Sequence, residues 1–251
     1  GLAEVVKALT DEKLEAWHGK TVKRQLPVVI LVGDTDGSAL VSRIFSEGLK
    51  RGDLDKTLKA NLPVSFSSPE DRVEQRARGA AAQAVGFRTA ALPPERQGDY
   101  LALGMIASLA STGKLLEELR DKQGLTDGAF VSFEPRLASG AFFAQVNSLP
   151  ENEARTRDAL LAALQALATA QTSDDEFEQG RNATIGRYSI SLQDHPSRTA
   201  EYARAIFFGR KPSDVEAQPD LIRTVKKTDI KRVAESLFKA GQPGRGVVRA
   251  Q

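Results

Sequence analysis

Histidine and cysteine, the side chains that most often bind catalytic zinc, are scarce in this chain of 251 residues. It has two histidines, His18 and His195, and no cysteine. Neither histidine has a second one four or five positions away, the spacing that a helical zinc motif requires. We therefore interpret both as surface or capping residues, and His195 before Pro196 suits the start of a helix. The chain alone is predicted to bind no metal or other cofactor, to hold no catalytic residue and to be inactive.

A second candidate for chemistry is an acidic loop after an apolar segment. Residues 28–32 read Val-Val-Ile-Leu-Val, and Asp34 and Asp36 follow them. An apolar strand followed by D-x-D-G resembles the nucleophile loop of haloacid-dehalogenase-like phosphohydrolases, which stay an alternative. Those folds continue as alternating strands and helices around a parallel sheet, whereas this chain continues with paired strands and then consecutive helices. We interpret Asp34 or Asp36 as the cap of the next helix.

The most informative segment follows an apolar helix over residues 99–110. Residues 114–127 read Lys-Leu-Leu-Glu-Glu-Leu-Arg-Asp-Lys-Gln-Gly-Leu-Thr-Asp. This order resembles the pattern S-R-L-x-x-x-L-R-E-K-x-G-L-x-Y of the insulinase/pitrilysin-type zinc metallopeptidases, a family that includes the mitochondrial processing peptidase. In that family the pattern lies in the half of the molecule that does not hold the metal. The resemblance implies zinc in a homologous half or partner subunit, and none here.

The resemblance also implies one substrate-binding residue, Arg120. Its counterpart in related enzymes reaches toward the bound peptide or the transition state, and a guanidinium suits this role because its planar fork recognises carbonyl and carboxylate groups. The family's tyrosine seven residues later is Asp127 here. A carboxylate would repel a developing oxyanion, so either this role is lost or the side chain points away. A salt bridge from Arg120 to Glu117 or Asp121 is the alternative interpretation.

A weak internal repeat suggests two homologous halves. Thr10-Asp-Glu-Lys and Thr228-Asp-Ile-Lys lie 218 positions apart, and each opens a helical pattern that leads to an apolar strand. We expect residues 1–50 to end the first, zinc-type half, residues 51–75 to form a linker, and residues 76–251 to form the second, non-catalytic half. About 140 residues of the first half, where the family places H-x-x-E-H, would then lie outside this chain.

Hydrophobic periodicity gives the order of the elements. Strands are predicted over residues 27–33, 80–92, 129–133, 139–146 and 246–248. Helices are predicted over residues 11–22, around 40–45, over 97–110, over 113–121, around 160–168, from about 195, and around 230–238. A further helix begins at a capping box over residues 173–176 and is predicted to continue through residues 188–192, although those alternate like a strand. The fold class is therefore α+β, a largely antiparallel sheet with helices packed on one face, which is also what the resemblance implies.

Composition narrows the function classes further. The net charge is +2, from 35 basic and 33 acidic residues, so no strong field toward nucleic acid is predicted. No apolar run reaches the length of a membrane span. With the resemblance, we expect the C-terminal, substrate-binding half of a zinc metalloendopeptidase, one wall of a chamber for an extended peptide. A catalytically inactive partner or structural core subunit is the alternative, and the bacterial periplasm is the favoured compartment.

Overall fold

The computed structural model describes residues 3–22, 28–47, 71–76, 81–90, 96–136, 139–168 and 172–250. The chain divides into two compact units, Gly1–Pro63 and Val64–Gln251. Most of the predicted linker over 51–75 lies outside the described residues. Its last part, Arg72–Arg76, forms the strand β1.

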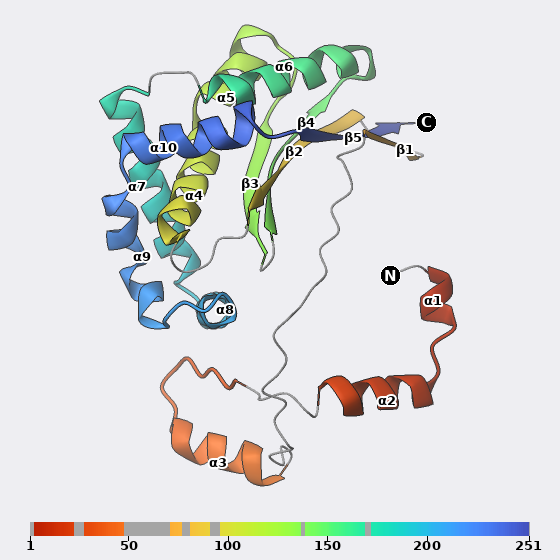
Figure 1. The fold of residues 1–251 in the computed structure, drawn as a ribbon, viewed down its shortest axis with the longest axis vertical. Helices are drawn as coiled ribbons and strands as arrows, with labels where there is room; N and C mark the ends of the chain where they lie inside the picture. Colours follow the sequence, from red (N-terminus) through yellow and green to blue (C-terminus); the bar gives the residue numbers. More distant parts are fainter. Residues whose placement is uncertain are drawn as a thin grey trace. The chain divides into compact units, whose positions relative to one another are not determined.

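The described residues of the first unit form three helices, labelled in Figure 1. They are α1 (Ala3–Lys7), α2 (Asp11–Thr21) and α3 (Gly37–Glu47). Thr10 caps α2, because its hydroxyl accepts a hydrogen bond from the Lys13 backbone N–H at 3.4 Å. Asp36 caps α3, because its carboxylate accepts a hydrogen bond from the Ser38 backbone N–H at 3.0 Å. Of the two predicted capping residues, Asp34 and Asp36, the structure uses Asp36. No residue of α1 or α2 is buried.

The strand predicted over residues 27–33 is wrong for the part that is described, residues 28–33, which pairs with no strand. A strand satisfies its backbone N–H and C=O groups through its neighbours in a sheet. The described part of the first unit offers no such neighbour. Val28 and Leu31 are accordingly exposed, although the apolar sequence is that of a buried strand.

The second unit is built on a five-stranded sheet with the order β1-β5-β2-β4-β3. The other strands are β2 (Ala81–Ala90), β3 (Ala129–Pro135), β4 (Ser139–Ser148) and β5 (Pro243–Ala250). β1 pairs with β5 in parallel, and the other pairings are antiparallel. The predicted fold class is thereby confirmed. β3 forms one edge of the sheet and β1 the other.

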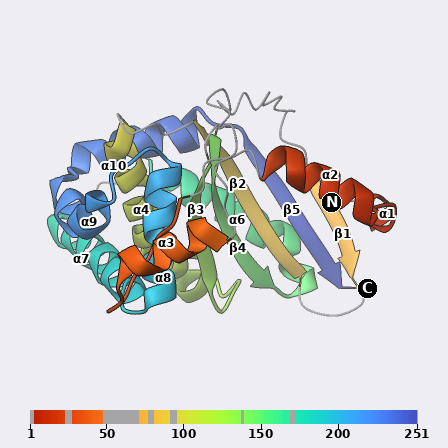
Figure 2. The same ribbon diagram turned by 90° about the horizontal axis from the view of Figure 1, so that it is seen from below.

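Helices pack on one face of this sheet, as predicted, and α6 lies behind β2 and β5 in Figure 2. Side chains alternate between the two faces of a strand, so Val85 and Phe87 of β2 are buried in the core. Phe238 meets Phe87 and Phe142 edge to face, with ring centroids 5.1 and 5.3 Å apart. These three rings join a helix, β2 and β4.

The helices of the second unit agree largely with the prediction. They are α4 (Gln97–Thr112), α5 (Lys114–Leu116), the π-helical turn η2 (Glu117–Lys122), the 3₁₀ turn η3 (Pro150–Asn152), α6 (Glu153–Ala166), α7 (Asp174–Ser191), α8 (His195–Phe207), α9 (Ser213–Thr224), α10 (Lys227–Ala234) and the π-helical turn η4 (Glu235–Lys239). The capping box is confirmed, since Ser173 and Glu176 bond reciprocally. One helix was missed between β4 and β5, because Gly209, with φ 72°, separates α8 from α9.

An ion pair joins α4 to α10 across 133 positions of sequence. The Arg232 guanidinium donates to the Asp99 carboxylate, which also accepts from Arg96 Nη2 at 2.6 Å. Burial raises the pKa of Asp99, but the hydrogen bonds from Arg232 and Arg96 outweigh it and hold this pKa below its ordinary value. This carboxylate therefore stays ionised in the folded protein at neutral pH.

Candidate functional site

Arg120 lies in η2, the turn that continues α5. Leu119 and Leu125 on either side of it are buried, whereas Arg120 is exposed. Gly124, with φ 61°, ends the turn, and its N–H donates to the Arg120 carbonyl at 3.0 Å. The two leucines thus anchor a short π-helical turn that presents the arginine outward, and such turns are frequent at functional sites.

The guanidinium of Arg120 binds its sequence neighbour. Its Nε donates to Asp121 Oδ1 at 2.7 Å, and this bond raises the pKa of Arg120 and lowers that of Asp121. Of the two predicted salt-bridge partners, Asp121 is the one used. Glu117 instead pairs with Lys122 at 3.2 Å. Arg120 is therefore held in place on the surface by a bond that a carboxylate or carbonyl of a ligand could exchange.

Asp127 stands at the apex of the next turn and is exposed. The turn is fixed by the buried Thr126, whose hydroxyl donates to the Gly128 carbonyl at 2.7 Å. Among the described residues Asp127 forms no ion pair with Arg120, so the structure does not join the two predicted positions to each other. Substrate binding by Arg120 stays a prediction.

A groove of about 240 Å³ lies next to the edge strand β3. Residues of α4, α7 and α9 line one side of it, and Val131, Ser132 and Phe133 line the other. Consecutive side chains of a strand point to opposite faces of the sheet. Val131 and Phe133 therefore share the face of β3 that the helices cover, where the Phe133 ring meets the Tyr100 ring of α4 with 5.7 Å between centroids. Within the described part of the chain no strand pairs with this edge.

The helical side of the groove carries donors and cations. Arg187 of α7 donates to the hydroxyl of Ser108, a buried residue of α4. Arg210 donates to Gln218 Oε1 at 3.3 Å, and its guanidinium carbon lies 4.8 Å from the ring centroid of Tyr100. Burial raises the pKa of Tyr100, although nearby Arg210 opposes this shift, so its hydroxyl stays protonated. The groove thus lies beside an edge strand and is lined by neutral polar groups and Arg187, while Arg210 contacts two of its lining residues.

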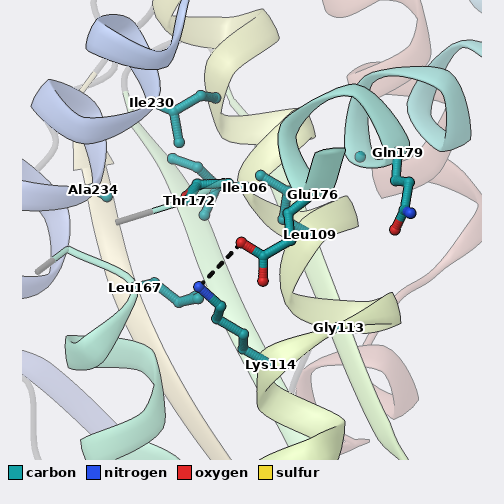
Figure 3. A pocket seen from close by; sticks show the side chains of 11 residues that line it. Ile106, Leu109, Gly113, Lys114, Leu167, Thr172, Glu176, Gln179, Ile230 and Ala234 are labelled. Atoms are coloured by element: carbon teal, nitrogen blue, oxygen red, sulfur yellow. Dashed lines mark ion pairs between the residues drawn. The ribbon is translucent and has the colours of Figure 1, made fainter. Parts of the chain in front are cut away.

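A smaller cavity of about 80 Å³ lies on another side of α4 (Figure 3). Its wall is apolar, with Ile106, Leu167 and Ile230, and Figure 3 shows Lys114 and Glu176 pointing toward each other across it. Their Nζ and Oε2 atoms are 3.3 Å apart. This volume holds only a few water molecules. Because Glu176 also belongs to the capping box, the pair has a structural explanation, tying α5 to the start of α7.

The two histidines lie apart from these features. His18 is in α2, and His195 is the first residue of α8, where Asp194 provides the cap by accepting from the Ser197 N–H at 2.8 Å. Asp194, and not His195, is therefore the capping residue. Within the described ranges no group of three or more His, Cys, Asp or Glu side chains is placed to hold a metal ion. The resemblance implies zinc in another half or subunit, and the described residues of this chain offer no group that fits it.

The sequence analysis missed the groove. Ser108 and Arg187 are 79 positions apart, and nothing in their local patterns indicates that α4 and α7 bring them together. The position of β3 at the edge depends on the order of strands, which periodicity does not determine. One wall of the groove was predicted from the sequence, because the strand over residues 129–133 was expected directly after the Arg120 segment.

A family model supports the resemblance. The model of the peptidase M16 inactive domain matches residues 8–184, more than half of the chain. No curated protein matches the chain. None of the helices in the described ranges has the length and apolar character needed to cross a membrane.

Solved structures share the fold. A protease from Helicobacter pylori is 18% identical, with a TM-score of 0.80 over 99% of this chain and 61% of that one. A peptidase M16 inactive domain from Pseudomonas fluorescens is 15% identical, with a TM-score of 0.77 over 99% of this chain and 59% of that one. The periplasmic protease PqqL from Escherichia coli is 12% identical, with a TM-score of 0.67 over 88% and 25% of the two chains. The chain thus spans less than two thirds of the length of these proteins.

Proposed function

Because the chain belongs to the peptidase M16 inactive-domain family, we propose that it is the non-catalytic, substrate-binding part of a zinc metalloendopeptidase. In this role it binds an extended peptide along the free edge of β3. The catalytic zinc belongs to a homologous half or a partner subunit, since the part of this chain that the structure describes has no group of side chains placed to bind it. No step of peptide hydrolysis is assigned to residues of this chain.

The groove beside Val131, Ser132 and Phe133 carries this proposal. An extended peptide that adds to a sheet edge gains main-chain hydrogen bonds, each contributing about 0.5–1.5 kcal/mol. Such bonds make little demand on the peptide sequence, which suits a peptidase with varied substrates. A groove of 240 Å³ has room for peptide side chains next to the edge.

Charge in the groove supports a preference among peptides. Arg187 of α7 lines the groove, and Arg210, between α8 and α9, donates to Gln218, one of its lining residues. No acidic residue lines the groove among the described residues. We therefore expect an acidic side chain, or the C-terminal carboxylate of a short peptide, to be favoured there over a basic one.

Arg120 supplies a second contact in this proposal. It lies on the segment that leads directly into β3, and its exposed guanidinium is paired only with the equally exposed Asp121 among the ion pairs described. A peptide carbonyl or carboxylate that displaces Asp121 would bind with little loss of protein stability, because exposed ion pairs contribute little.

One observation favours a second candidate, an inactive partner or structural core subunit. Asp127 occupies the position of the family's tyrosine, and its exposed carboxylate cannot stabilise an oxyanion. The two candidates differ in whether Arg120 matters for turnover. A periplasmic location is proposed for both, by analogy with the periplasmic protease of similar fold; cell fractionation tests it, and recovery with cytoplasmic markers would contradict it.

The experiment uses peptides methylated on backbone nitrogen. A peptide of about ten residues, selected from a random library for binding to the chain, is synthesised in two forms with N-methyl groups on alternate residues. Only one set of alternate N–H groups can face β3. We expect methylation of that set to lower affinity about tenfold or more and methylation of the other set to change it less than about threefold.

Equal loss from both sets, or from neither, would refute edge-strand pairing. The Arg187→Ala variant serves as an independent check on location. This substitution should weaken the binding of acidic peptides more than the binding of otherwise identical peptides with glutamine. The matched control is Arg223→Ala, which removes an exposed arginine that ion-pairs within α9 and should weaken both kinds of peptide equally little.

A further inference from the structure

The cavity in Figure 3 has an apolar end and a charged end. The apolar end is formed by the side chains of Ile106, Ile230 and Ala234, which are at most 7% exposed. The charged end is formed by Lys114 of α5 and Glu176 of α7, whose side chains are each 41% exposed. The opposite charges of this pair therefore lie on the solvent side of the cavity.

The two charged groups are held differently. Glu176 is fixed, because the Ser173 backbone N–H donates to its Oε2 at 2.8 Å and its own N–H donates to the Ser173 hydroxyl. The bond from Ser173 and the nearby Lys114 hold the pKa of Glu176 below its ordinary value, although burial opposes them, so this carboxylate is ionised at neutral pH. The Lys114 ammonium ends a flexible stem and can move to admit a ligand.

The fold itself gains little from this arrangement. An exposed ion pair contributes little to stability, and the capping box at the start of α7 needs only Ser173 and Glu176. Apolar side chains that border a cavity lose dispersion contacts, which an alkyl group of a ligand would restore. The cavity therefore suits a ligand that combines a small alkyl group with charges for its other end.

A free α-amino acid carries the matching charges. Its ammonium and carboxylate are attached to one carbon atom, so a nitrogen and an oxygen lie about 3 Å apart. Lys114 Nζ and Glu176 Oε2 are 3.3 Å apart. An amino acid that lies alongside the pair, with its carboxylate toward Lys114 and its ammonium toward Glu176, places each charge next to an opposite one. A peptide bond at either end of the ligand removes one of these charges.

The apolar end determines which side chain fits. Its volume of about 80 Å³, enough for a few water molecules, is that of a small branched alkyl group. Leucine, isoleucine and valine have such groups. Glycine would leave the apolar wall without a contact, and each buried methylene of a ligand contributes about fourfold in affinity. A charged side chain would lose its hydration against Ile106 and Ile230.

We propose that this cavity binds a free branched-chain amino acid as its zwitterion. The carboxylate of the ligand pairs with Lys114, its ammonium pairs with Glu176, and its alkyl side chain packs against Ile106 and Ile230. The site is separate from the groove beside β3, which lies on another side of α4, and it does not depend on the proposed function.

Methyl NMR of isoleucine locates the ligand. The whole chain is labelled with ¹³C at the isoleucine δ1 methyl groups and titrated with leucine. We expect the methyl resonances of Ile106 and Ile230 to shift along one saturation curve, with a Kd of about 0.1–10 mM. The resonance of Ile190, which lies on α7 outside the cavity and is 64% exposed, should stay in place.

Three ligands test the chemical groups of the amino acid one at a time. Leucinamide lacks the carboxylate, N-acetylleucine lacks the ammonium, and glycine lacks the alkyl group. Each should bind at least about tenfold more weakly than leucine, because each loses a charge-assisted contact or the burial of several methylenes. This series uses the unaltered protein, so it does not depend on whether a variant folds.

A pair of variants tests the cation. Lys114→Met keeps most of the apolar stem and removes the charge, so it should weaken leucine binding at least about tenfold. Lys122→Met is the matched control, because it removes an exposed cation of η2 that pairs with Glu117 and does not line this cavity. It should leave leucine binding within about twofold.

Three results would overturn the inference. Ligands with one charge that bind within about threefold of leucine would indicate a site for any small amphiphile. Equal shifts at Ile190 would indicate binding without a defined site. No shift at Ile106 and Ile230 up to about 50 mM leucine would show that the cavity does not admit the ligand. None of these results bears on edge-strand pairing, which the N-methylated peptides test separately.

Discussion

Gly180 of α7 faces Leu109 of α4 so closely that the glycine has no room for a side chain. A Cβ at position 180 would overlap Leu109 Cδ2 and lie 2.7 Å from its Cγ. Since α4 and α7 both contribute to the helical side of the groove, this close approach accompanies the hydrogen bond from Arg187 to Ser108. The shape of the groove therefore depends on a glycine that does not itself line it.

Gly180→Ala should lower the free energy of unfolding by up to about 2 kcal/mol, because the overpacking cost of about 1–3 kcal/mol outweighs the gain of about 1 kcal/mol in helix propensity. Urea denaturation measures it. Gly186→Ala in the same helix is the matched control, as a Cβ there meets nothing within 4 Å, and it should stabilise the protein. Equal effects of the two substitutions would show that α4 and α7 separate without cost.

The ion pair of Asp99 with Arg232 predicts a pH dependence of stability. The pKa of Asp99 in the folded protein lies below its ordinary 3.8, so the pair contributes fully above this value and is lost as the pH falls through the lower folded pKa. Asp99→Asn should cost about 1–2 kcal/mol at pH 7 and almost nothing near pH 2.

Chemical denaturation of both proteins from pH 2 to pH 7 checks this expectation. Glu178→Gln removes the carboxylate of a more exposed pair, with Arg181 at 2.7 Å, and should change stability by less than about 0.5 kcal/mol at any of these pH values. An Asp99→Asn effect that is constant across the range would mean that packing, and not the charge, is responsible.

Arg120→Ala separates the two candidate functions. In the protein reconstituted with its zinc-bearing half, a substrate-binding role predicts a fall in kcat/KM of roughly ten- to a thousand-fold, about 1.4–4 kcal/mol of lost charge-assisted contact. A structural subunit predicts turnover within about twofold of the original. Lys122→Ala, which removes a neighbouring exposed cation of η2, is the control.

Asp127→Tyr restores the residue of the family pattern. Because a tyrosine hydroxyl can donate to an oxyanion and a carboxylate cannot, activity of the reconstituted protein should rise if Thr126 and Gly128 hold the turn in the geometry of an active enzyme. Steady-state kinetics measure it. A reconstituted enzyme that cleaves well and is indifferent to both substitutions would show that Arg120 and Asp127 were wrongly chosen.

Zinc binding by the isolated chain should be weak, at high micromolar dissociation constants or above, because no histidine pair or cysteine is present. Elemental analysis after dialysis against metal-free buffer checks this. One equivalent of zinc that survives dialysis would contradict it and would redirect attention to ligands contributed by carboxylates.

Much of the fold could be predicted because local signals carried it. The Ser173 and Glu176 capping box fixed the start of α7 against the strand-like alternation of residues 188–192, which the structure shows as helix to Ser191. A capping box is formed by residues three positions apart, so it can be predicted from the local sequence. Residues 28–32 were misassigned for the opposite reason, since a strand depends on a neighbour that local sequence does not supply.

The candidate site was harder to predict. Arg120 was predicted as a site residue because its segment resembles a family pattern. Its ion-pair partner was left open between Glu117 and Asp121. The groove combines residues of α4, β3, α7 and α9 through packing between helices distant in sequence. It lies beside β3, whose place at the edge of the described sheet depends on strand order and is not marked by any residue type in the sequence.

The two edges of the sheet differ in how they meet other molecules of the same protein. β1 is short and carries the exposed charges of Arg72 and Glu74, which discourage strands from adding to it. β3 is longer and exposes Phe130 near its start, with its charged residue, Glu134, only near its end. Unless a peptide or the parent protein shields it, β3 is a template for polymerisation, so the edge proposed to bind substrate also limits how concentrated the isolated chain can become before it aggregates.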